Sequence, residues 1–160
     1  MSEKLSEAEI VDRFKSWFER EFPESVAISQ FKMAGGRVDV AAFNWPEESE
    51  FEIHAWGIEC KKDVSSRSIY SNLDQLSSYG KYFPFVYLLV GRVREENNDH
   101  LSKVANDRRF GIFCLESPNT VRTVHEARPG LFGMNEYREI RAKGVALLTF
   151  VDLFGKRHST

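Results

Sequence analysis

The sequence has few of the residues that mark disulfide-bonded, zinc-binding or membrane-spanning proteins. Its two cysteines, Cys60 and Cys114, form no CxxC motif, and its four histidines form no pair at metal-ligand spacing, which argues against a disulfide framework and a zinc site. The apolar run 145–154 is interrupted by Thr149 and Asp152 and is shorter than the ~20 residues of a membrane span. The N-terminus is polar and has no apolar signal segment. We therefore expect a cytoplasmic protein that does not associate with membranes.

The sequence also lacks a strong excess of charge. Its formal net charge of −2 neither requires nor excludes a nucleic-acid partner, so any phosphate-binding surface must be local. Acidic residues crowd between positions 47 and 52, and basic residues concentrate in the middle of the chain. By itself this asymmetry is typical of a solvated surface. The basic residues in question are Lys61, Lys62, Arg67, Lys81, Arg92, Arg94, Lys103, Arg108 and Arg109.

Neither internal repeats nor linkers rich in Gly, Pro or Ser divide the chain, so we expect one domain spanning residues 1–160. Ser6 and Glu9 form a capping-box pattern that opens a helix ending near Phe22. Hydrophobic spacing then predicts strands near 26–33, 37–43 and 51–61, a helix over 68–82, a strand over 85–90, a helix over 99–108, strands over 111–115 and 120–126, and a last helix over 135–154 with a break at Gly144. A meander followed by alternating helices and strands predicts an α/β fold with a mixed sheet and helices on both faces.

Three charged residues fall where two predicted strands can meet. Glu59 and Lys61 are two residues apart, so both side chains point to one face of the third strand. Asp39 lies in the second strand, the expected hairpin partner of the third. The hairpin can place Asp39 beside Glu59, although the loop between them is long enough to leave the register open.

This set of residues suits a divalent cation. Two adjacent carboxylates repel each other and raise a pKa, and a bound cation removes that conflict. Oxygen ligands from Asp39 and Glu59 favour Mg²⁺ or Mn²⁺, and the backbone carbonyl of Cys60 supplies a further candidate ligand. Lys61 can contact a phosphate or the attacking water and stabilise the negative charge of a transition state.

A lone D…ExK pattern has little specificity, since a solvent-facing ion pair between Glu59 and Lys61 explains it equally well. The context favours a functional site for three reasons. The pair ends a strand whose other positions on that face are apolar or small, Asp39 follows a Gly-Gly turn, and a helix carrying Gln75 and Tyr79 comes soon after.

The segments GGRVDVAAF, WGIECKKD and DQLSSYGKYFPFVYLLVG resemble the PD-(D/E)XK nuclease superfamily, which includes restriction endonucleases, Holliday-junction resolvases and RecB-like nuclease domains. The resemblance covers about residues 26–90 and a preceding helix. It implies a restriction endonuclease-like αβββαβ core and Mg²⁺- or Mn²⁺-dependent hydrolysis of DNA. Val38 stands where the name-giving proline would be.

The resemblance also assigns roles to individual residues. Asp39 and Glu59 match the metal-binding acids, Lys61 matches the catalytic lysine, and Gln75 with Tyr79 matches the Gln-x-x-x-Tyr motif of the RecB-like branch. The family often adds an acid from the first helix, for which Glu9, Glu19 and Glu21 are candidates.

Other cations near these motifs are weaker candidates for nucleic-acid contact. Lys62 and Arg67 follow the motif directly but are equally typical of exposed loops, and Lys81 can simply complement a helix dipole.

We expect a metal-dependent endonuclease acting on DNA, with RNA as an open alternative substrate. The competing hypothesis is a catalytically silent nucleic-acid-binding or protein-interaction module of the same fold. Because the chain is small, a homodimer or larger complex would supply surface to wrap duplex DNA.

Overall fold

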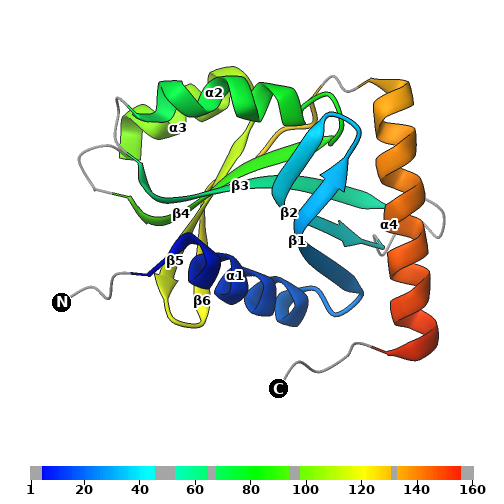
Figure 1. Cartoon of the computed structure of the whole chain (residues 1–160). Helices are drawn as coiled ribbons and strands as arrows, with labels where there is room; N and C mark the ends of the chain where they lie inside the picture. The colour runs from blue at the N-terminus through cyan, green and yellow to red at the C-terminus, as the bar shows by residue number, and fades with distance from the viewer. Residues whose placement is uncertain (1–4, 46–52, 65–67, 94–97, 131–132, 156–160) are drawn as a thin grey trace.

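The computed structural model describes residues 5–45, 53–64, 68–93, 98–130 and 133–155, and these residues form a six-stranded mixed sheet flanked by helices (Figure 1). The elements in chain order are α1 (Glu7–Glu21), β1 (Ser25–Met33), β2 (Gly36–Asn44), β3 (His54–Val64), α2 (Ser68–Tyr79), β4 (Phe85–Val93), α3 (Asn98–Arg108), β5 (Gly111–Ser117), β6 (Thr120–His125) and α4 (Met134–Phe154). The predicted α/β class and the αβββαβ order of the first six elements are confirmed.

The strands lie in the sheet in the order in which they occur in the sequence, β1 to β6. The pairs β1–β2 and β2–β3 are antiparallel, β3–β4 and β4–β5 are parallel, and β5–β6 is antiparallel. The two parallel pairs are joined by the crossover helices α2 and α3, as parallel neighbours require.

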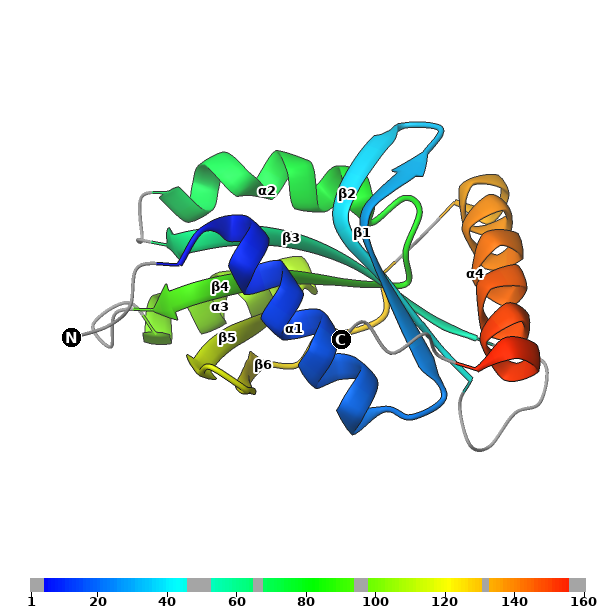
Figure 2. The same ribbon diagram turned by 60° about the horizontal axis from the view of Figure 1, so that its bottom comes forward.

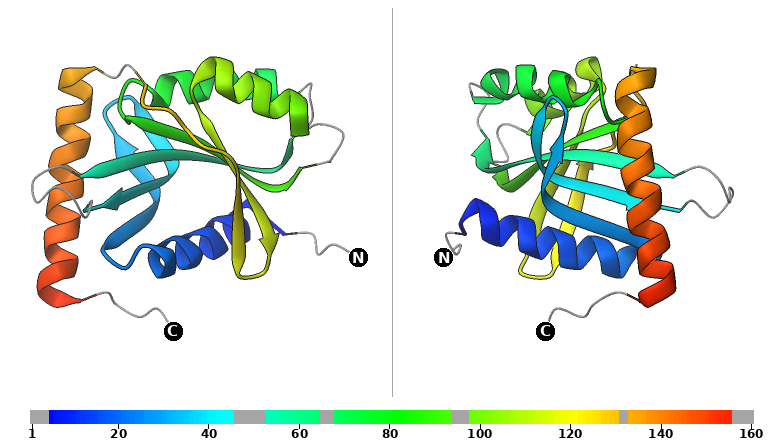
Figure 3. Two further views of the ribbon diagram at one scale, coloured as in Figure 1. Left: turned by 180° about the vertical axis from the view of Figure 1, so that it is seen from behind. Right: turned by 45° about the vertical axis from the view of Figure 1, so that its right-hand side comes forward.

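Helices cover both faces of this sheet (Figures 1 and 2). Helix α1 lies on one face, where Ile10, Phe14 and Phe18 join a buried cluster. On the other face lie α2 and α3, and α4 packs on that same face at the far end of the β1–β2–β3 meander (Figure 3). Among the described residues, no helix is long and apolar enough to cross a membrane.

Strand β3 is buried on both faces, which fixes the direction of each of its side chains. Ala55 joins the cluster beneath α2 and α4, whereas Ile58 and Cys60 join the cluster beneath α1. Glu59 therefore points toward α2, on the same side as Ala55. This is the two-faced pattern predicted for a central strand.

The predicted break at Gly144 is wrong, because α4 runs without interruption from Met134 to Phe154. Gly144 is buried where the helix crosses β2 and the start of β3, and a Cβ atom at this position would collide with the side chains of Phe43 and Ile53. The glycine allows the helix to approach the sheet closely, and packing outweighs its poor helix propensity.

We expect Gly144→Ala to lower the free energy of unfolding by about 1 kcal/mol. Overpacking against Phe43 and Ile53 costs roughly 1–3 kcal/mol, which exceeds the gain of about 1 kcal/mol in helix propensity. Chemical denaturation measures the change. Ala142→Gly, at an exposed position of the same helix, is the control and should also lose about 1 kcal/mol. A more stable Gly144→Ala variant would contradict the close packing.

Candidate active site

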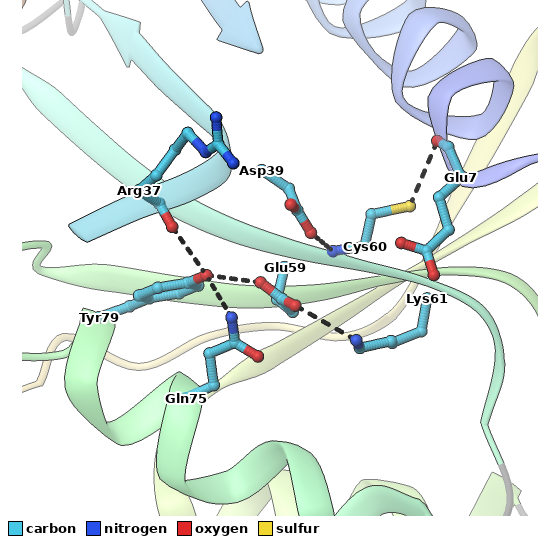
Figure 4. Close-up of polar contacts among 8 residues, drawn as sticks. All are labelled: Glu7, Arg37, Asp39, Glu59, Cys60, Lys61, Gln75 and Tyr79. Carbon is cyan, nitrogen blue, oxygen red and sulfur yellow. Dashed lines mark hydrogen bonds and ion pairs between the residues drawn. The ribbon is translucent and has the colours of Figure 1, made fainter. Parts of the chain in front are cut away.

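Asp39 lies where β2 separates from β3. The pairs between these strands end at Val40 and Ile58, and one further step in the same register places Asp39 opposite Glu59. In place of a backbone bond, the Cys60 N–H donates to Oδ2 of Asp39 at 2.8 Å (Figure 4). The carboxylate thus continues the hydrogen bonding between the strands after their backbones have separated.

A kink in β1 accompanies this separation. Gln30 has a positive φ of 54° and lies between the paired residues Ser29 and Phe31, opposite Asp39. Although Val38 and Val40 are two residues apart, they join buried clusters on opposite faces of the sheet. The backbone therefore rotates at Asp39, and the carboxylate points toward the edge of β3. Kinks of this kind commonly redirect a side chain near an active site.

Glu59 is a buried acid with charged and polar neighbours. Its side chain is 4% exposed, and its Oε1 lies 3.5 Å from Nζ of Lys61, whose side chain is 33% exposed. The Tyr79 hydroxyl donates to Oε2 of Glu59 at 2.6 Å. The predicted pair from one strand is therefore in contact, and α2 adds a tyrosine to it (Figure 4).

Gln75 contacts this group through Tyr79. Its Nε2 donates to the Tyr79 hydroxyl at 3.0 Å, and the same hydroxyl lies 3.3 Å from the backbone carbonyl of Arg37 on β2. Residues 75 and 79 lie one turn apart on α2, so both reach the same side. Tyr79 therefore contacts Glu59 directly, and Gln75 contacts Tyr79.

The surroundings of Glu59 raise its pKa from 4.5 to about 7. Burial is the largest cause, and the charge of Asp39 and a hydrogen bond with its side chain raise the pKa further. The Tyr79 hydrogen bond and the charge of Lys61 act in the opposite direction but do not restore the ordinary value. Glu59 therefore keeps its proton to a higher pH than an exposed glutamate does.

Cys60 separates Glu59 from Lys61 and faces α1. Its thiol donates to the Glu7 carbonyl at 3.7 Å, and burial together with three nearby carboxylates raises its pKa. A thiol held protonated in this way is a poor nucleophile. The N–H and C=O groups of one strand residue point to the same edge, so the Cys60 carbonyl points toward β2, where its N–H meets Asp39.

A pocket of about 180 Å³ opens beside this edge and is lined by Glu7, Asp12, Gln30 and Asp39 among others. Glu7 is the acid that sequence reasoning missed. It begins α1, next to Cys60, and a first-turn glutamate normally indicates only a favourable interaction with the helix dipole. The place of Glu7 in the sequence therefore does not indicate that it lies near Asp39.

The acids proposed from the first helix lie in other places. The Glu9 side chain forms the capping box with Ser6. Glu19 accepts a hydrogen bond from the Ala27 N–H at 3.1 Å. Glu21 is exposed at the far end of α1, about 21 Å along the axis from Glu7. The geometry therefore does not bring Glu9, Glu19 or Glu21 to Asp39.

The weaker candidates for nucleic-acid contact are also separated from this group. Lys62 is exposed on β3 and alternates to the α1 side of the sheet. Lys81 follows α2 and lines a different pocket, described below. Arg67 lies outside the described residues.

The candidate ligands around Asp39 and Glu59 can be compared with those that a metal ion requires. Within the described parts of the chain, no three His, Cys, Asp or Glu side chains gather closely enough to hold a metal ion by themselves. Asp39 lies opposite Glu59 in the extended strand register and raises the pKa of Glu59, and the Cys60 carbonyl points to the same edge. Two carboxylates with open remaining positions suit Mg²⁺, which keeps several waters, and suit zinc poorly.

No family model matches the sequence, and no curated protein matches it. Among solved structures, SfsA from Pyrococcus furiosus in complex with Ca²⁺ matches with 12% sequence identity and a TM-score of 0.30. The match covers 74% of this chain and 62% of the SfsA chain, so less than two thirds of that protein is spanned. At this TM-score the likeness supports no conclusion about function.

We expect the stability of the metal-free protein to fall as the pH rises from about 4.5 to 7. In this window folded Glu59 keeps a proton that the unfolded chain has lost, so the unfolded state binds fewer protons. The shift corresponds to about 3 kcal/mol over the window. Glu59→Gln should remove this decline, which denaturation in EDTA at several pH values measures. Glu24→Gln, at an exposed position, should keep the wild-type slope. Equal slopes for wild type and Glu59→Gln would refute the assignment.

Proposed function

We propose that this protein is a nuclease that hydrolyses phosphodiester bonds of DNA with Mg²⁺ or Mn²⁺ as cofactor. The observation that carries the proposal is the placement of Asp39 opposite buried Glu59, whose pKa is raised to about 7 by its burial and by Asp39. A buried acid beside a second acid is unfavourable when both are ionised, and a divalent cation is the natural counter-charge. The ammonium group of Lys61 lies 3.5 Å from the same carboxyl group. It adds a positive side chain that can stabilise the charge of a phosphate.

The residues that would hold the ion are Asp39, Glu59 and the carbonyl of Cys60. One or two carboxylates with waters and substrate phosphate oxygens are the usual ligands of Mg²⁺. When bound there, the ion would supply a water of lowered pKa and neutralise charge on the phosphate. Glu7, which shares the 180 Å³ pocket with Asp39, is positioned to accept hydrogen bonds from waters of that shell.

The side chains of the chain itself perform the remaining steps. Lys61 combines partial exposure with the ion pair to Glu59, so its ammonium can donate to a phosphate oxygen as negative charge accumulates there. Tyr79 fixes the orientation of the Glu59 carboxylate through the 2.6 Å hydrogen bond. Gln75 in turn fixes the Tyr79 hydroxyl, which makes Gln75 a positioning residue in this proposal.

The proposal concerns DNA first, with RNA as the competing substrate. A silent module of the same fold would bind nucleic acid without needing a cation. The homodimer, the single domain over 1–160 and the cytoplasmic location remain predictions. Cleavage of linear, circular and four-way-junction DNA and of matched RNA, each with and without Mn²⁺, separates these possibilities.

Asp39→Asn should reduce DNA cleavage by roughly 10³-fold, because it removes one of two charged ligands. Lys61→Met should reduce the rate constant by roughly 10²–10³-fold, the usual loss for one donor to a developing oxyanion. Initial rates at saturating Mn²⁺ measure both effects. Lys62→Met removes the same charge one residue further along β3 and is the matched control, with little expected change.

Binding of Mn²⁺ by calorimetry completes this test. Asp39→Asn should weaken Mn²⁺ binding, whereas Lys61→Met should not weaken it. If neither DNA nor RNA is cut by the folded wild-type protein, or if Asp39→Asn cuts normally, the nuclease proposal fails.

Tyr79→Phe should lower the rate about 10-fold and move the acidic limb of the pH–rate profile to higher pH. Loss of a ligand's hydrogen-bond partner typically costs 10–100-fold, and the hydroxyl now lowers the pKa of Glu59. Gln75→Leu should produce a smaller effect in the same direction, since it acts through Tyr79. Tyr70→Phe, an exposed tyrosine on the same helix, is the control. An unchanged pH profile in Tyr79→Phe would exclude the positioning role.

A further inference from the structure

A second pocket lies between α2, α3 and the segment 128–130, with a volume of about 280 Å³. Helices α2 and α3 lie over the same face of the sheet (Figure 3). Helix α2 presents Gln75 and Tyr79 to Glu59, whereas Ser77 and Gly80 line this pocket. The pocket is therefore distinct from the group around Asp39, and none of the chemistry proposed above uses it.

Positive charge gathers at the rim of this pocket. Lys81, Arg108, Arg109 and Arg128 all line it, and none of the described residues that line it is Asp or Glu. Arginine presents donors in a planar fork that fits phosphate and carboxylate oxygens. Four cations around one opening in a chain of net charge −2 favour a ligand that carries more than one negative charge.

The floor of the pocket is apolar. Leu73, Pro84 and Val86 line it and keep part of their apolar surface exposed, above the buried side chains of Phe83 and Phe110. An inorganic anion alone would leave this surface without a partner, whereas a ring attached to the anion would cover it. The lining thus matches a molecule with an anionic end and a flat, largely apolar body.

The rim is held in place before any ligand binds. The Arg128 backbone N–H donates to the Arg109 carbonyl at 3.1 Å, and the Gly130 N–H donates to the Pro84 carbonyl at 2.9 Å. The Arg128 guanidinium donates to the Asn106 carbonyl, and that of Arg109 donates to the Pro129 carbonyl at 3.3 Å. Each guanidinium has five N–H donors, so further donors remain for a ligand.

Arg109 occupies a backbone position that normally belongs to glycine. It directly follows α3 with a φ of +68°, the left-handed conformation in which helices commonly end on glycine. An arginine is strained at this position. Its side chain lines the pocket, which gives a reason for an arginine where glycine would fit better.

We propose that this pocket binds a nucleoside monophosphate, with the phosphate among the four cations and the base on the apolar floor. The volume lies just below the usual 300–1,000 Å³ of small-molecule pockets, which suits one nucleotide. The same chemistry is presented by a free nucleotide and by the 5′-phosphorylated end of a nucleic-acid strand. Binding requires neither a cation at Asp39 nor strand cleavage, so the inference goes beyond the proposed nuclease activity.

Calorimetric titration of the full chain in EDTA tests the proposal, with AMP as one probe and a 5′-phosphorylated trinucleotide as the other. Inorganic phosphate and adenosine should each bind at least about tenfold more weakly than AMP, since each lacks half of the contacts. Arg109→Gly should weaken binding by about tenfold or more and melt no lower than wild type, because glycine suits the backbone there. Arg108→Gln should also weaken binding, whereas Arg138→Gln, exposed on α4, should not.

The two probes distinguish the sources of the ligand. Equal affinity for AMP and the trinucleotide supports a free nucleotide, and a clear preference for the trinucleotide supports a strand end. The proposal is overturned if neither probe binds at millimolar concentration, if adenosine or inorganic phosphate binds as tightly as AMP, or if both arginine variants bind as wild type does. Asp39→Asn must bind AMP normally, since weaker binding would place the nucleotide at the other site.

Discussion

The candidate site depends on one hydrogen bond, from the Cys60 N–H to the Asp39 carboxylate. A buried backbone N–H left without a partner is costly, and the residues of β2 that precede Val40 are not paired with β3. The Asp39 side chain takes over as acceptor. The same bond therefore closes the end of the strand pair, fixes the position of Asp39 relative to Glu59, and leaves the Cys60 carbonyl pointing to the same edge.

Glu59 shows how far the site departs from a purely structural arrangement. Burial and Asp39 destabilise its charged form more than Tyr79 and Lys61 stabilise it, as the pKa of about 7 records. A structural ion pair would show the opposite balance, with the carboxyl pKa lowered by its partner. A buried acid beside a second acid reduces the stability of the fold, and ionisable groups perturbed in this way are typical of functional sites.

The sequence alone was sufficient to predict the elements and the pairing of Glu59 with Lys61, because both follow from hydrophobic period and strand alternation. It could not determine the register of β2 against β3 across residues 46–52, nor the rotation of the backbone at Asp39 that accompanies the kink at Gln30. The break predicted at Gly144 failed because the close approach of Phe43 and Ile53 comes from residues distant in the chain. Glu7 escaped notice for a similar reason, since its place beside Cys60 depends on where α1 crosses the sheet.

The contact of Phe83, which follows α2, with Gly57 on β3 positions the group around Glu59 and the 280 Å³ pocket together. Phe83 packs directly on Gly57, where any Cβ atom would collide with its ring, and Gly57 lies two residues before Glu59 on the same face of β3. The Phe83 N–H donates to the Tyr79 carbonyl at 3.0 Å, so seating the phenylalanine also fixes the end of α2. Tyr79 then reaches Glu59 on one side, while the buried Phe83 ring supports the lining of the 280 Å³ pocket on the other. A side chain at position 57 would displace both features together, because the same aromatic contact sets the position of the helix along the strand.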